Sequence, residues 1–172
     1  NKEEYSINLI GDMTSFGFIE MTIEILNNFG FNILKPSNEN KNEISIKIKG
    51  WTDLCESTYN IESDLSSASY LIAWSYINKF NLILTNTKPN STQPDLKILN
   101  NMIKYFGSSE YINNSMIFKP FKEINIDKTQ EEIKINLDSS DTFLTWALLF
   151  VIEKIKRNKN FISKIIIDNI EN

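Results

Sequence analysis

Hydrophobic residues in this chain follow two spacings, one typical of helices and one typical of strands. Helical spacing predicts helices over about residues 19–29, 66–77 and 96–106, and a last helix that begins near residue 141. The predicted strands are Tyr5–Ile10, Phe31–Leu34, Ile44–Ile48, Asn81–Thr85, Tyr111–Ile112, Met116–Phe118, Ile133–Leu137 and Phe161–Ile167. Helices and strands alternate along the chain, so we expect an α/β protein of the mixed α+β kind.

The helix over residues 66–77 has the most distinct beginning. Asp64, Ser66 and Ser67 are three candidate N-caps, because a short side chain with an oxygen can accept a hydrogen bond from the free N–H groups of the first turn. The residues that follow are small, so these N–H groups could also approach an anion closely. A well-capped and closely packed helix start is the simpler interpretation.

Two pairs of segments resemble each other. Ile19–Gly30 aligns with Leu96–Gly107 at an offset of 77 residues, and Ser66–Trp74 aligns with Ser139–Ala147 at an offset of 73. Each member of the first pair ends in glycine, which predicts a left-handed C′ glycine after each helix. The pattern indicates a repeated unit of helix, strand, helix, strand and strand with a period of about 75 residues. Chance similarity between amphipathic helices is the alternative.

Composition narrows the chemistry. The formal charge is −4 without a basic stripe, which argues against a nucleic-acid partner. The chain has no histidine, which excludes Ser–His–Asp catalysis and histidine-based metal sites, and nothing indicates a metal or an organic cofactor. Arginine occurs once, at Arg157, so a phosphate or carboxylate site has one guanidinium to use.

Cys55 is the only cysteine, which excludes a disulfide within the chain and favours a reducing compartment, the cytoplasm. The longest apolar run, around Phe143–Ile152, is much shorter than the ~20 residues of a membrane-spanning helix. The N-terminal residues lack the apolar region of a signal peptide. We therefore expect no membrane partner, and because the sequence does not begin with Met we expect a piece of a longer polypeptide.

Four segments resemble motifs of the 5-enolpyruvylshikimate-3-phosphate synthase family, including its version within pentafunctional shikimate-pathway polypeptides. These segments are Phe18–Asn32, Ile61–Leu71, Asn90–Asp95 and Asp141–Ala147. Their order and spacing also agree, and the resemblance covers nearly the whole chain. It implies the two-domain enolpyruvyl-transferase architecture, only partly covered here, with each domain built from βαβαββ units. Residues 1–62 would then end the first domain, and residues 63–172 would form part of the second.

The resemblance also implies a reaction, the transfer of the carboxyvinyl group of phosphoenolpyruvate to shikimate 3-phosphate with loss of phosphate. Asp141 matches the family's catalytic aspartate, which contacts the shikimate hydroxyls and accepts a proton. Ser15 matches a serine that contacts the substrate phosphate. Helix starts in the family face the substrate cleft, as we expect for those at Ser66 and Ser139. On residue type alone, Asp141 would be a first-turn carboxylate and Ser15 an ordinary turn residue.

Three positions depart from the family's motifs. Phe18 stands where a substrate-contacting tyrosine is usual, Phe16–Gly17 replaces a Lys-Pro pair, and Pro94 replaces a glycine. The family's Lys/Ser/Arg phosphate grip, its Ser-Ser-Gln segment and its Arg-x-Lys-Glu run have no counterpart here. We therefore expect an incomplete portion of the enzyme that is inactive without the rest of the parent polypeptide.

Two other functions remain open from the sequence. One is a transferase of the same fold that acts on a nucleotide sugar. That family uses a reactive cysteine, and Cys55 lies in a region that matches none of the family motifs, so such a cysteine would have to lie in the missing segments. The other is a non-catalytic or regulatory domain that retains the fold for binding or assembly, which Phe18 and Pro94 would favour.

Overall fold

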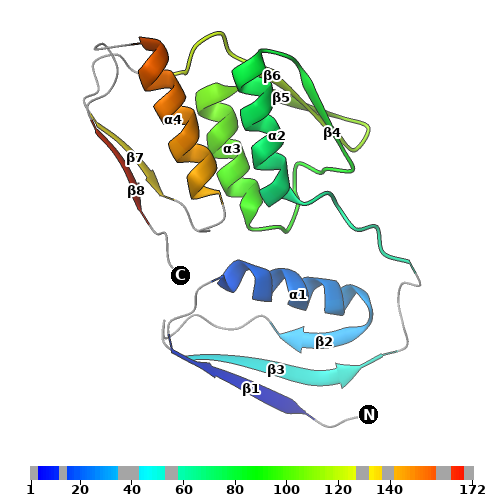
Figure 1. The fold of residues 1–172 in the computed structure, drawn as a ribbon. Coiled ribbons are helices and arrows are strands. Elements are labelled where there is room, and N and C mark those ends of the chain that lie inside the picture. The colour runs from blue at the N-terminus through cyan, green and yellow to red at the C-terminus, as the bar shows by residue number, and fades with distance from the viewer. Residues whose placement is uncertain are drawn as a thin grey trace. The chain divides into compact units, whose positions relative to one another are not determined.

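The computed structural model describes residues 4–11, 15–34, 43–52, 58–126, 132–136, 142–157 and 164–168. Figure 1 shows the four helices and eight strands that these residues form. The chain divides into two compact units, Asn1–Ile61 and Glu62–Asn172. Each unit has its own hydrophobic core, as expected for segments that fold around separate apolar clusters.

The first unit is a three-stranded antiparallel sheet with one helix. Its elements are β1 (Tyr5–Ile10), α1 (Phe16–Asn28), β2 (Phe31–Leu34) and β3 (Glu43–Trp51), and the strand order is β1-β3-β2. The helix and two of the strands contribute isoleucines to the core, namely Ile23, Ile33, Ile44 and Ile46. Gly30 follows α1 with φ of 93°, which confirms the predicted left-handed glycine after this helix.

The second unit repeats this arrangement. Its elements β4 (Leu82–Thr85), α3 (Asp95–Phe106), β5 (Gly107–Ile112) and β6 (Ser115–Pro120) form an antiparallel sheet in the order β4-β6-β5. In both units, therefore, the first strand of a β-α-β-β segment pairs with the third strand, and the second strand lies on the far side. The shared topology confirms the repeat that the helix alignment predicted.

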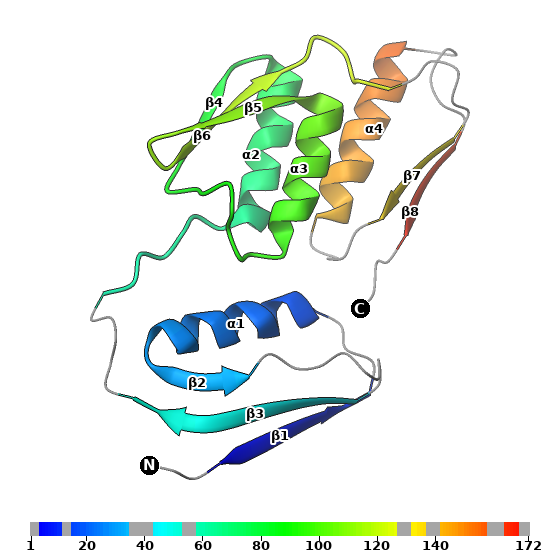
Figure 2. The ribbon, with the colours of Figure 1, turned by 180° about the vertical axis from the view of Figure 1, so that it is seen from behind.

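The remaining elements of the second unit are α2 (Leu65–Asn78), β7 (Glu132–Asn136), α4 (Phe143–Arg157) and β8 (Lys164–Asp168). The strands β7 and β8 pair in parallel, and α4 connects them along the chain. Figures 1 and 2 show α2, α3 and α4 side by side. The alignment of α2 with α4 extends to burial, because Ile72 and Tyr76 are buried and so are Thr145 and Leu149, which stand 73 positions later.

Aromatic rings fill the space among these three helices. Tyr76 and Phe106 meet edge to face with ring centroids 4.9 Å apart. Phe106 lies 5.7 Å from Trp146, and Trp146 stacks on Phe150 at 5.9 Å. Such offset and edge-to-face pairs add to the stabilisation that burial of the rings already provides.

The prediction of a left-handed glycine at Gly107 is wrong. Its φ of −174° and ψ of −158° are extended values, and it is the first residue of β5 instead of a left-handed C′ residue. The glycine is required for space: a Cβ at Gly107 would lie 2.3 Å from Cε2 of Phe118 and 2.5 Å from the Lys119 carbonyl oxygen. Close approach of the backbone to a buried ring is therefore the reason for this glycine.

Among the residues that the structure describes, none of the helices combines the length and the hydropathy needed to cross a bilayer.

Candidate functional site

Ser15, one of the two predicted site residues, directly precedes α1. Its φ of 61° and ψ of 27° lie in the left-handed region, which costs a residue with a side chain roughly 1–2 kcal/mol. The backbone carbonyl of Ser15 accepts a hydrogen bond from Phe18 N–H at 3.0 Å, whereas its hydroxyl makes no capping bond to the helix. Non-glycine residues in this conformation concentrate at functional sites. Ser15 is exposed, so its hydroxyl can reach a ligand.

Two of the departures from the family's motifs have different structural consequences. Phe18 lies in the first turn of α1 with 37% of its surface exposed, so an apolar ring stands where a hydroxyl is usual. Pro94 has φ of −59° and ψ of −28°, values that suit proline, and α3 begins normally after it. The loop before α3 therefore accommodates its proline without strain.

The start of α2 is capped by protein groups. Asp64 is the N-cap among the three candidates: its Oδ1 accepts from Ser66 N–H at 3.0 Å, and its Oδ2 accepts from the Ser67 hydroxyl. Leu65 N–H donates to Oε1 of Gln93 at 3.0 Å. The first two amides of α2 are thus already satisfied, as the capped interpretation of this helix start predicts.

Gln93 joins the loop before α3 to the segment that leads into α2. Its Nε2 donates to the Ser63 carbonyl oxygen at 2.9 Å, while its Oε1 holds the Leu65 amide. Ser63 is fixed to the end of β4 as well, because its N–H donates to Asn86 O at 2.9 Å and its hydroxyl to Thr85 O at 2.8 Å. These bonds anchor the first residues of the second unit. The sequence gave one indication that Gln93 matters, since Gln93 lies in Asn90–Asp95, one of the four segments that resemble the family's motifs.

Glu62 strengthens the same anchor. Its carboxylate lies 3.3 Å from Nζ of Lys88, with 13% of the Glu62 side chain exposed. Burial, and then the charge of Glu62, raise the pKa of the Tyr111 hydroxyl above its usual value. Both effects disfavour a negative charge on the Tyr111 oxygen.

The Gln93→Ala variant is expected to lose about 1–3 kcal/mol of unfolding free energy, because it leaves the Leu65 N–H and the Ser63 carbonyl without their partly buried partner. Equilibrium urea unfolding measures the loss. Thr92→Ala, at the exposed neighbouring position, is the matched control and should change stability by less than about 0.5 kcal/mol. Equal stability of the two variants would show that the Gln93 bonds contribute nothing to the anchor.

Asp141, the second predicted site residue, lies outside the described residues, as do Ser139 and Cys55. The turn that follows Asp141 is described, and its polar side chains are buried. At the start of α4, three buried side-chain atoms have no hydrogen-bond partner among the residues that the structure describes. These atoms are Thr142 Oγ1, Thr145 Oγ1 and Trp146 Nε1. A buried polar atom left unpaired costs about 1–3 kcal/mol, so such atoms gather where function or bound water requires them. Sequence reasoning did not single out these three residues.

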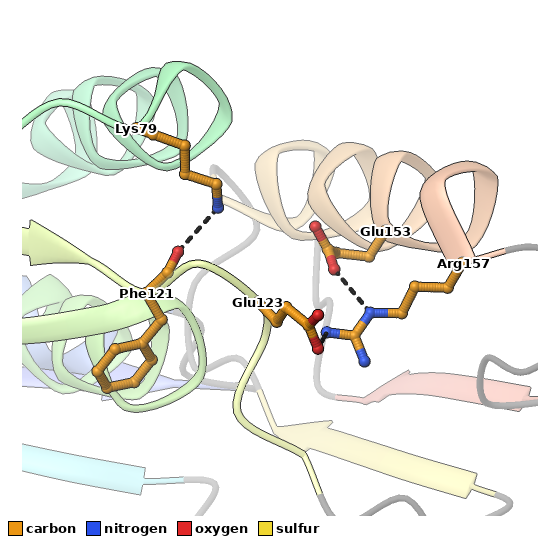
Figure 3. Close-up of polar contacts among 5 residues, drawn as sticks. All are labelled: Lys79, Phe121, Glu123, Glu153 and Arg157. Atoms are coloured by element: carbon orange, nitrogen blue, oxygen red, sulfur yellow. Dashed lines mark hydrogen bonds and ion pairs between the residues drawn. The ribbon is translucent and has the colours of Figure 1, made fainter.

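The single arginine is engaged in a network at the far end of α4, which Figure 3 shows. Nε of Arg157 donates to Oε2 of the buried Glu153 at 3.2 Å, and Nη2 donates to Oε2 of Glu123 at 3.1 Å. Beside this network, Nζ of Lys79 donates to the Phe121 carbonyl oxygen at 2.8 Å. The guanidinium therefore joins α4 to the segment after β6. Because Arg157 is the single arginine of this sequence, no other guanidinium is available here for a phosphate or carboxylate ligand.

Lys79 and Tyr76 lie against each other near this network. Nζ of Lys79 is 3.5 Å from the centroid of the Tyr76 ring, a cation–π contact. Burial, and then the positive charge of Lys156, lower the pKa of Lys79. Burial, and then the carboxylate of Glu153, raise the pKa of Tyr76. Both shifts follow from the cost of placing charge in this partly dry region.

The described ranges contain no group of three or more His, Cys, Asp or Glu side chains that could hold a metal ion.

The duplicated β-α-β-β segment, with its first strand pairing with its third in both copies, places the chain among proteins built from repeated α/β units. A family model described as EPSP synthase (3-phosphoshikimate 1-carboxyvinyltransferase) matches residues 2–170. The chain belongs to the EPSP synthase family. This confirms the resemblance found in the four sequence motifs and is consistent with the predicted enolpyruvyl-transferase fold.

Curated relatives agree with this family. The chain is 35% identical over 133 residues to the 3-phosphoshikimate 1-carboxyvinyltransferase of Methanococcus maripaludis strain C6, covering 75% of this chain and 30% of that protein. The enzyme of the same description from Methanocaldococcus jannaschii is 35% identical over 108 residues, 63% of this chain and 24% of its own. A pentafunctional AROM polypeptide of Pneumocystis carinii is 29% identical over 166 residues, 95% of this chain and 10% of its own. The chain thus spans less than a third of the length of these relatives.

Proposed function

We propose that the polypeptide carrying these residues transfers the carboxyvinyl group of phosphoenolpyruvate to shikimate 3-phosphate, a step of the shikimate pathway to chorismate and the aromatic amino acids. The observation that carries this proposal is the match of the EPSP synthase family model to residues 2–170. The printed names of the relatives agree with it. The lone cysteine favours the reducing cytoplasm as the place of the reaction.

In this proposal Asp141 accepts a proton during the reaction, and the Ser15 hydroxyl binds the phosphate of shikimate 3-phosphate. The exposed position of Ser15 supports its role, because its hydroxyl makes no capping bond to α1 and can reach a ligand. The unpaired buried atoms of Thr142 and Thr145 support a functional role for the start of α4. We assign residues 1–62 to the end of the first domain and residues 63–172 to part of the second.

The rest of the parent polypeptide is required for activity in this proposal. The chain spans about 30% of the Methanococcus maripaludis relative, and its single guanidinium already pairs with Glu153 and Glu123. Binding a phosphorylated, carboxylated substrate pair ordinarily uses several cationic side chains. The 172 residues alone should therefore show no transfer.

Phosphate release tests the proposal. The full polypeptide should release phosphate when phosphoenolpyruvate and shikimate 3-phosphate are both present, and not with either substrate alone. Replacing shikimate 3-phosphate by shikimate provides the matched control, because it removes the group that Ser15 is proposed to bind. Absence of release by a folded full polypeptide supplied with both substrates would contradict a synthase.

Phe18 supports a second candidate function, a non-catalytic domain that retains the fold for binding or assembly. Its partly exposed ring replaces a hydroxyl that the family uses toward the substrate. Under this function, shikimate 3-phosphate at 100 times its dissociation constant would still stabilise the folded polypeptide by ~2.7 kcal/mol, yet no phosphate would be released. Measuring thermal protection beside phosphate release separates the two functions.

A further inference from the structure

The C-terminal ends of α2, α3 and α4 meet around the short segment that follows β6. Phe121 N–H donates to the carbonyl oxygen of Phe106, the last residue of α3, at 2.9 Å, and its carbonyl accepts from Nζ of Lys79, the C-cap of α2, at 2.8 Å. Glu123 accepts from Arg157, the last residue of α4, at 3.1 Å. Figures 1 and 2 show the three helices side by side, and Figure 3 shows the contacts of Lys79 and Arg157. One segment therefore contacts all three helix ends.

Positive charge is concentrated on this surface, which we call the basic end of the second unit. It carries six cations against two carboxylates, a surplus of four positive charges, whereas the whole chain has a formal charge of −4. The carboxylates are Glu123 and Glu153, and one of the cations is Arg157. The other cations are exposed lysines, namely Lys79, Lys104, Lys122, Lys154 and Lys156. Sequence reasoning did not find this surface, because its lysines come from four separate segments of the chain.

Complementing the helix dipoles explains only part of this charge. A cation in the last turn of a helix stabilises it by about 0.3–1 kcal/mol, and Lys104, Lys154 and Lys156 lie in such turns. Lys122 does not, since it lies between β6 and β7 and belongs to no helix. The cations also crowd one another, because partial burial and then the positive charge of Lys156 lower the pKa of Lys79. Crowded like charges repel, and a bound anionic partner would relieve that repulsion.

Ion pairing does not neutralise the lysines of the basic end within the described part of the chain. Both carboxylates pair with Arg157 instead. Nζ of Lys79 donates to the neutral carbonyl of Phe121. None of the other four lysines forms an ion pair with a carboxylate of the described residues. Five ammonium groups are therefore available to attract anionic groups of a partner.

The kind of cation indicates the kind of partner. Phosphate groups of nucleic acids are best recognised by the planar fork of arginine, whereas the available cations here are all lysines. Since the basic end is +4 and the whole chain is −4, the rest of the chain carries −8 and repels a long polyanion. A short segment rich in aspartate and glutamate can contact the basic end while the solvent screens that more distant negative charge.

We propose that the basic end of the second unit binds a short acidic segment of a separate protein. Exposed lysines suit a transient interface, because obligate interfaces are more apolar. Charge attraction steers the acidic segment to this surface and makes the affinity fall as salt is added. The basic end lies at the opposite end of α4 from Thr142, so the proposal does not depend on the transfer reaction.

Fluorescence anisotropy tests the proposal with the full polypeptide and a labelled peptide of alternating glutamate and glycine. In about 0.05 M salt, the double variant Lys122→Gln/Lys156→Gln should bind the peptide about 5-fold or more weakly than the unaltered polypeptide, because two attractive charges are lost. The matched control is Lys47→Gln/Lys49→Gln, which removes two exposed lysines of β3 in the first unit and should bind as tightly as the unaltered polypeptide. Lys104→Gln/Lys154→Gln provides a second test pair if the first does not fold.

Four results would overturn the proposal. Equal weakening in the test and control variants would mean that binding follows net charge and not the basic end. Absence of peptide binding by the folded full polypeptide would mean that the basic end is not available to a partner. Tighter binding of a single-stranded oligonucleotide of equal charge would identify a nucleic acid as the partner. Binding that persists in about 1 M salt, where charges are screened beyond ~3 Å, would exclude charge attraction as its cause.

Discussion

The Asp141→Ala variant of the full polypeptide should release phosphate with a kcat lower by about 10²–10⁴-fold, the usual contribution of a general base. Alanine cannot accept the proton that the proposed reaction moves. A purely structural carboxylate at the start of α4 would instead stabilise the helix by about 0.3–1 kcal/mol and leave kcat unchanged. Steady-state phosphate release with both substrates at saturation measures the difference.

Asp141→Asn separates the two roles more sharply than alanine does. Asparagine caps a helix about as well as aspartate, but it cannot act as a base. We expect this variant to keep its melting temperature and lose its activity. Asp168→Asn, at an exposed carboxylate at the end of β8, is the matched control and should keep both. An Asp141→Asn variant with full activity would show that Asp141 is not the base.

The Gly107→Ala variant should lose about 3 kcal/mol of unfolding free energy, a large effect for the addition of one methyl group. The new Cβ would lie 2.3 Å from Cε2 of Phe118, a ring with 0% exposure, and 2.5 Å from the backbone oxygen of Lys119. Neither neighbour can move away without disturbing β6, which pairs with both β4 and β5. Urea unfolding of the variant beside the unaltered protein measures the loss.

Gly107→Asn distinguishes this explanation from the one based on helix ends. A left-handed C′ position accepts asparagine, whereas a position without space for a Cβ rejects it at least as strongly as it rejects alanine. We therefore expect Gly107→Asn to be no more stable than Gly107→Ala. Ser108→Ala, at the exposed next residue, should change stability by less than about 0.5 kcal/mol. An asparagine variant of normal stability would mean that Gly107 serves as a helix terminator.

The elements of this fold were predictable because their signals are local. β1 and β2 occupy the predicted residues, Tyr5–Ile10 and Phe31–Leu34, where runs of strand-forming residues meet turn residues. The alignment of Ile19–Gly30 with Leu96–Gly107 predicted a repeated unit, and the two three-stranded sheets have the same strand order. Periodicity and repetition depend only on the order of the residues, so they can be recognised without any knowledge of contacts between distant residues.

The functional site was predictable to a smaller extent. The motifs identified the family, which the family model confirmed over residues 2–170. The roles of Ser15 and Asp141 stay predictions, because a role depends on where a side chain lies relative to a substrate. The left-handed backbone of Ser15 could not be predicted, since serine gives no reason to expect φ of 61°.

By itself, the sequence determined the α/β class, the repeat and the family, because spacing, composition and motif order are local properties of the chain. Tertiary structure alone decided what Gly107, Gln93 and Arg157 do. Gly107 makes room for the ring of Phe118, Gln93 holds Ser63 and Leu65, and Arg157 joins Glu153 to Glu123. Each of these roles depends on at least one partner eleven or more positions away, which only folding brings close. The spacing of residues along the chain does not reveal such contacts.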